Sequence, residues 1–79
     1  MIAVYAKNKS KPLTETQLEL LDYIKQRIRD DGYPPTLSEI CSWFGWSAKR
    51  SASEMLERLE AAGVVELHVG VARGIRVIP

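Results

Sequence analysis

Apolar side chains recur every three or four residues in three separate segments of the chain, which is the spacing of one face of a helix. The segments cover residues 14–31, 36–44 and 47–62. The apolar positions of the first segment are Leu18, Leu21, Ile24 and Ile28, and those of the third are Ala52, Met55, Leu56, Leu59 and Ala62. The pattern therefore predicts three helices separated by short connections.

Capping residues indicate where these helices begin. Thr14 and Thr36 are each followed three positions later by Gln or Glu, so each threonine can form a capping box with the first turn of its helix. Ser47 is the expected N-cap of the third helix. Gly45 lies between the second and third segments, where its conformational freedom allows a sharp turn.

From residue 64 onward the helical period is replaced by a strand-like pattern. Residues 64–68 and 74–78 are predicted strands, and the loop between them contains Gly70, which suits a hairpin. The predicted fold class is therefore α+β and mainly α, with three helices followed by a β-hairpin within residues 13–79. Residues 1–12 are expected to form an N-terminal extension, which would be a frayed terminus, a DNA-contacting arm or an added strand.

Composition excludes several classes of protein. A chain of 79 residues with 46% hydrophobic and 27% charged residues suits one small soluble domain. One cysteine and one histidine are too few for a disulfide framework or a zinc finger. No apolar run suits a membrane span or a signal peptide, so a cytoplasmic protein is expected. We find no set of catalytic or metal-ligating residues, and we expect no enzyme activity, cofactor or small-molecule ligand.

Two short helices joined by a glycine turn are typical of a helix-turn-helix, whose second helix enters the major groove of DNA. A following hairpin would be the wing, with Arg73 at its tip. The residues around the start of the third helix are small, basic or hydrogen-bonding, as contacts to base edges and phosphates require. The predicted DNA-contacting residues are Ser47, Ala48, Lys49, Arg50, Ser51, Ser53, Glu54, Arg73 and Arg76.

The net charge of +1 leaves a second interpretation open, because DNA-binding domains are usually clearly basic. The same fold could be a protein-interaction module, such as an antirepressor or corepressor that binds another regulator. An exposed Trp43 would favour this alternative. Trp46 is expected to fill the core beneath the helix-turn-helix, and Cys41 is expected to be a small buried apolar residue.

Residues 13–77 resemble the N-terminal DNA-binding domain of the LexA family of bacterial SOS repressors. The resemblance rests on Gly-Tyr-Pro-Pro-Thr at 32–36 with Glu-Ile at 39–40, and on Ala-Arg-Gly-Ile-Arg at 72–76. It implies a winged helix-turn-helix that binds double-stranded DNA at a palindromic operator as a dimer and represses transcription.

Two departures from the family pattern change what the resemblance implies. The family usually has asparagine at the position of Arg50 and glutamate at that of Ser53, so we expect an operator other than the family's CTG-type half-site. Family members also carry a C-terminal self-cleavage domain that supplies most of the dimerisation. A chain ending at Pro79 would lack it, either as an excised fragment or as a small stand-alone regulator of bacterial or mobile-element origin.

Overall fold

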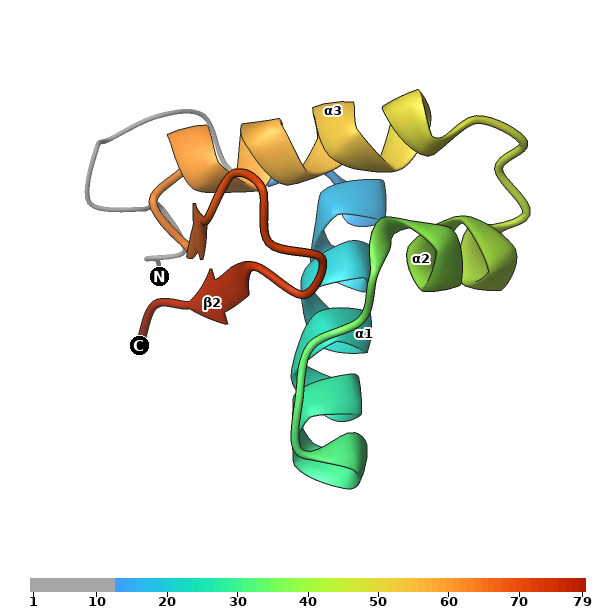
Figure 1. Ribbon diagram of the computed structural model, residues 1–79. Coiled ribbons are helices and arrows are strands. Elements are labelled where there is room, and N and C mark those ends of the chain that lie inside the picture. The colour runs from blue at the N-terminus through green and yellow to red at the C-terminus, as the bar shows by residue number, and fades with distance from the viewer. Residues whose placement is uncertain (1–12) are drawn as a thin grey trace.

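The computed structural model describes residues 13–79, in which three helices are followed by a two-stranded hairpin (Figure 1). The helices are α1 (Glu15–Asp31), α2 (Leu37–Phe44) and α3 (Lys49–Ala61), and the strands are β1 (Val65–Leu67) and β2 (Ile75–Val77). Helix α1 crosses beneath α3, and the hairpin returns along the flank of α3. This is the predicted winged helix-turn-helix. The expectations for residues 1–12 lie outside the described residues.

Helix α1 begins and ends where the sequence predicts. The Thr14 side chain accepts from the backbone N–H of Gln17, the Gln17 side chain accepts in return from that of Thr14, and Gly32 ends the helix with φ 87°. Of the predicted apolar face, Leu21 and Ile24 are buried and Ile28 packs against the core, while fully buried Leu20 joins them. Leu18 lies about 200° around the helix from Leu20 and is 45% exposed, so its placement in the core was wrong.

The helix-turn-helix is formed by α2, a short turn and α3. The capping box of Thr36 and Glu39 begins α2, and Gly45 ends it with φ 76°. The predicted cap of α3 was wrong by one residue: Ala48, not Ser47, is the N-cap. The reason lies in the Ala48 carbonyl, which accepts from the Ser51 N–H at 3.0 Å and from the Cys41 thiol at 3.4 Å and so holds residue 48 at the helix boundary.

The hairpin pairs β1 with β2 in antiparallel register, with Glu66 opposite Arg76. The loop between the strands is closed by backbone hydrogen bonds from the His68 N–H to the Gly74 carbonyl and from the Gly74 N–H to the Val71 carbonyl. Gly74 is required by close approach, because a Cβ there would lie 2.5 Å from the His68 carbonyl oxygen. The wing loop is therefore a compact structure that depends on one glycine.

One small core joins all the elements. Its fully buried side chains come from α1, α2, α3 and β1 and include Ile40, Leu59 and Val65. Cys41 is buried as predicted, while Trp46 is only partly buried and packs against the core edge through a stacked contact with the Phe44 ring at 4.8 Å. The hairpin contributes to the same core, so the wing and the helices are one folding unit.

Substituting Gly74 by alanine should destabilise the domain. The added methyl group would force the His68 carbonyl to move, so we expect the free energy of unfolding in urea to fall by about 1–3 kcal/mol. Ala72→Ser, at an exposed position of the same loop, is the matched control and should leave that free energy nearly unchanged. Equal stability of the Gly74→Ala variant and the wild type would contradict the close approach.

Candidate nucleic-acid interface

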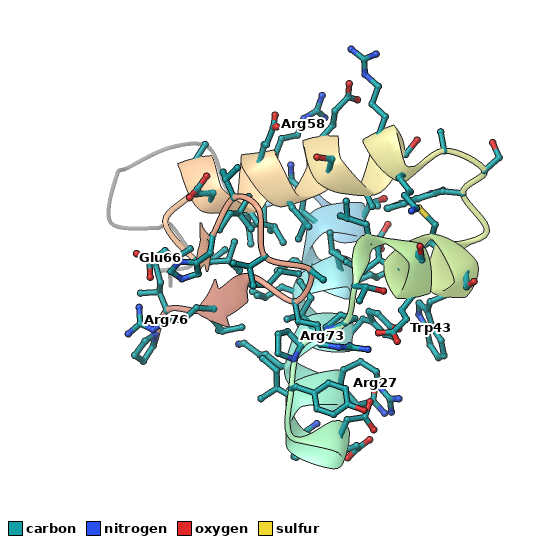
Figure 2. The ribbon with its side chains drawn as sticks, in the orientation of Figure 1. Arg27, Trp43, Arg58, Glu66, Arg73 and Arg76 are labelled. Atoms are coloured by element: carbon teal, nitrogen blue, oxygen red, sulfur yellow. The ribbon has the colours of Figure 1, made fainter. Side chains whose placement is uncertain are left out.

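The outward face of α3 carries a row of charged side chains. Arg50, Glu54 and Arg58 are four residues apart, so they lie in line on the side of the helix opposite to buried Ala52 and Leu59. Figure 2 shows Arg58 pointing away from the rest of the domain. This row is the exposed outer surface of α3.

The predicted contact residues at α3 separate into two groups. Ser47, Ala48, Lys49, Arg50 and Glu54 are exposed, while Ser51 and Ser53 are partly buried. Ser53 lines a groove of about 370 Å³ between α3 and the wing loop, together with Leu37 and Val71. Ser51 and Ser53 therefore face the sides of the helix rather than its outer surface.

Sequence reasoning missed Glu57 and Arg58 as members of the outward face. Both are exposed and lie about one turn beyond Glu54 on the same side of α3. The four-residue spacing from Arg50 and Glu54 could have identified Arg58. The outer surface of α3 therefore extends further toward the helix C-terminus than predicted.

Arg50 has one partner within the domain. Its Nε lies 3.1 Å from Oε2 of Glu54, and the Arg50 side chain is 85% exposed. An exposed ion pair at this helical spacing is worth only about 0.3–0.5 kcal/mol, so a stronger acceptor could replace the carboxylate. An arginine and a glutamate held one turn apart offer donors suited to guanine and an acceptor suited to the cytosine amino group.

The wing does not present Arg73 at its tip, and that prediction was wrong. The tip consists of Val69, Gly70 and Val71, and Val69 is 99% exposed. Arg73 lies at the base of the loop and points back toward α2, because a carboxylate, a backbone carbonyl and an aromatic ring all receive its guanidinium there (Figure 2). The exposed tip of the wing is therefore apolar.

Four contacts hold Arg73 in this position. Its two terminal nitrogens donate to Oε1 and Oε2 of Glu39 at 2.9 and 3.0 Å, and Nη1 also donates to the Pro34 carbonyl at 2.8 Å. The guanidinium carbon lies 4.4 Å from the centre of the Tyr33 ring. We call this set of residues the wing anchor. It ties the wing to the first turn of α2, 34 residues earlier in the chain, and to the segment between α1 and α2, 39 residues earlier.

The ionisation of Glu39 depends on the wing anchor. Hydrogen bonds from Arg73, and then one from the Thr36 backbone N–H, hold the pKa of the Glu39 carboxyl below its ordinary value. The same carboxylate raises the pKa of Arg73. One side chain therefore closes the capping box of α2 and binds the wing.

Arg76, the second predicted wing contact, is paired across the hairpin. Its Nη1 donates to Oε1 of Glu66 at 3.0 Å, and both side chains are largely exposed. Figure 2 shows Arg76 and Glu66 together at the edge of the hairpin, well apart from Arg58. The structure therefore does not bring the two wing arginines and the α3 row into a single cluster.

Comparison with known proteins identifies this arrangement. Residues 10–74 match the family described as the LexA DNA binding domain. The chain belongs to this family. The matched region covers all three helices and the wing loop, so family membership and fold agree.

The similar proteins are LexA repressors. That of Colwellia psychrerythraea is 41% identical over 68 residues, which are 86% of this chain and 32% of the relative. That of Cupriavidus metallidurans is 47% identical over 64 residues, which are 81% of this chain and 29% of the relative. That of Shewanella amazonensis is 44% identical over 66 residues, which are 84% of this chain and 32% of the relative. The chain spans about a third of the length of these LexA relatives.

The described residues hold no group of three His, Cys, Asp or Glu side chains that could bind a metal ion. Within the same part of the chain, no helix has the length and apolar character needed to cross a membrane.

The wing anchor predicts a pH-dependent stability. Because the folded-state pKa of Glu39 lies below the unfolded one, the ion pair stabilises the domain above the ordinary value of 4.5, and this contribution is lost as the pH falls through the lowered value. Glu39→Gln, which keeps a capping side chain, should unfold at lower urea concentration than wild type at pH 7. The difference should shrink toward pH 3.

Arg73→Gln is the partner test of the same ion pair. The double variant Glu39→Gln/Arg73→Gln should be no less stable than the worse single variant, because both changes remove one interaction. Additive losses in the double variant would show that the two side chains act independently.

Proposed function

We propose that this domain is the operator-binding part of a transcriptional repressor. In this proposal α3 enters the major groove of double-stranded DNA, and its N-terminal residues contact base edges. The observation that carries the proposal is the exposed row of Arg50, Glu54 and Arg58 on the outer face of the second helix of a helix-turn-helix. The LexA repressors that the chain resembles support the same role.

The charge distribution supports a local mode of binding. Residues 1–12 contain three of the eleven Lys and Arg residues and none of the ten acids, so residues 13–79 carry a net charge of −2. Attraction by overall charge therefore does not direct the described domain to DNA. Binding would depend on the cations at the start of α3, Lys49 on phosphate and Arg50 on a base.

The wing would contribute differently from a basic wing. Arg73 is engaged by three groups of the domain, so we assign it to positioning the loop beside α3. Arg76 could exchange exposed Glu66 for a phosphate, and it remains the proposed cation of the hairpin. The apolar tip at Val69 would lie against sugar and backbone atoms rather than pair with phosphate.

Two copies of the domain would bind one operator. A helix-turn-helix covers a half-site, and inverted half-sites about one helical turn apart require a second domain related by a two-fold axis. We therefore propose a palindromic operator, bound by a homodimer in a bacterial cytoplasm, with a binding role and no catalytic step.

Selection of duplexes from a random pool, at low and at physiological salt, tests this proposal directly. We expect enrichment of an inverted repeat that survives physiological salt. Enrichment of a single half-site would contradict the dimer but retain the DNA-binding role. Loss of all enrichment at physiological salt would leave only non-specific attraction to phosphate and would overturn the proposed function.

Substitutions at the start of α3 should separate base contacts from phosphate contacts. On the selected duplex, Arg50→Ala should cost about 1–3 kcal/mol of binding free energy and relax the preference at one base position. Lys49→Ala should weaken binding to all sequences equally and reduce the salt slope by about one. Arg29→Ala, an exposed cation in the last turn of α1, is the control and should change neither quantity. Equal losses on every sequence from Arg50→Ala would exclude a base contact.

A further inference from the structure

A second exposed surface lies on the side of α2 that faces α1. The Trp43 side chain is 65% exposed, and its ring stacks on that of Tyr23 with 5.0 Å between centroids and 19° between planes. Figure 2 shows Trp43 beneath α2, whereas Arg58 points upward from α3. The aromatic face formed by Trp43 and Tyr23 would therefore remain accessible while α3 lies in the major groove of DNA.

The aromatic face is part of a continuous row of rings. The Tyr23 ring contacts the Phe44 ring edge to face, with 6.0 Å between their centroids. The Phe44 ring stacks on that of Trp46, with 4.8 Å between their centroids. The Tyr23 hydroxyl, whose pKa is raised by burial, donates to the Glu39 carbonyl at 3.5 Å. The inner side of the Trp43 ring thus packs on the buried Tyr23 ring, and its outer side is exposed.

Carboxylates line the two hollows beside Trp43. One hollow, of about 460 Å³, is bounded by Glu19, Asp22 and Gln26, and the other, of about 400 Å³, is bounded by Glu39 and Ser42. Neither hollow has a lysine or arginine in its wall.

The carboxylates differ in their availability. Glu39 is occupied by Arg73, whereas within residues 13–79 neither Glu19 nor Asp22 forms an ion pair. The nearby cation Arg27 is engaged by Asp30 and Asp31 at 3.2 Å each. The face therefore combines an exposed indole with two carboxylates that lack a cation, which is the chemistry that receives a guanidinium or ammonium group.

We propose that the Trp43 face binds an arginine- or lysine-bearing segment of a partner protein. The cationic side chain would stack on the outer side of the Trp43 ring and pair with Glu19 or Asp22. Charge complementarity favours this occupant, because the face is acidic and aromatic and therefore repels DNA and suits a basic peptide. This binding does not depend on the proposed operator contact, because it uses residues on the opposite side of α2.

The test is a titration of the ¹⁵N-labelled full chain with an acetylated, amidated Gly-Arg-Gly-Arg peptide, without DNA. The indole N–H resonance of Trp43 should shift saturably, while that of Trp46 at the core edge stays fixed as an internal reference. A peptide with citrulline in place of arginine has the same shape without the charge and should cause little shift. Equal shifts with both peptides, or no saturable shift, would overturn the proposal.

Variants of the acidic residues distinguish binding at this face from non-specific attraction of the peptide to the negatively charged domain. Glu19→Gln/Asp22→Asn should weaken the arginine peptide at least about threefold. Glu54→Gln/Glu57→Gln on α3 removes the same net charge and should leave the affinity unchanged. Trp43→Leu should abolish the shift of neighbouring amides. Equal weakening by both double variants would overturn the proposal.

Two further measurements exclude other occupants. If the Trp43 resonance moves with protein concentration alone, the face is a contact between copies of this chain, and the partner proposal fails. If deletion of residues 1–12 moves the Trp43 resonance and tightens peptide binding, the lysines of that segment occupy the face instead. The expected result is that neither change moves the resonance. Because no DNA is present, failure here leaves the operator-binding test untouched.

Discussion

The carboxylate of Glu39 joins the two parts of this domain that would meet DNA. It accepts a hydrogen bond from the Thr36 backbone N–H at the start of α2. It also accepts hydrogen bonds from both terminal nitrogens of Arg73 and so holds the wing. The Tyr33 ring and the Pro34 carbonyl complete the site from the segment before α2. The wing is therefore held by its core residues Val65 and Ile75 and by a carboxylate that also serves as a helix cap.

The contacts that hold Arg73 within the domain also limit what the wing would contribute to DNA binding. A wing arginine that is bound by three groups of its own domain is a poor donor to phosphate, since a contact with DNA would first have to break those bonds. The positive charge available to DNA is thereby concentrated at the start of α3, in a domain whose described part has a net negative charge. Affinity would then rest on few contacts, and a second copy on the same operator would supply the remainder.

The domain also separates its surfaces by chemistry. The outer face of α3 alternates cations and carboxylates, the tip of the wing is apolar, and the α1 side of α2 is aromatic and acidic. Figure 2 shows Trp43 beneath α2 and Arg58 above α3, so the Trp43 face and the α3 row point away from each other. If both proposals hold, the domain would contact DNA and a protein at once.

Local interactions explain what the sequence alone determined. Helical spacing, two capping boxes, the glycine turn and the change to a strand pattern predicted all five elements, because each depends on residues within a few positions of one another. The helical spacing did not decide how far around α1 the buried side extends, so Leu18 was misplaced in the core. It also did not record the hydrogen bond from the Cys41 thiol to the Ala48 carbonyl, which places the cap at residue 48 rather than at Ser47. The direction of Arg73 and the stacking of Trp43 on Tyr23 were decided only by tertiary structure, since their partners lie 34 and 20 residues away and no local pattern records a contact at that separation.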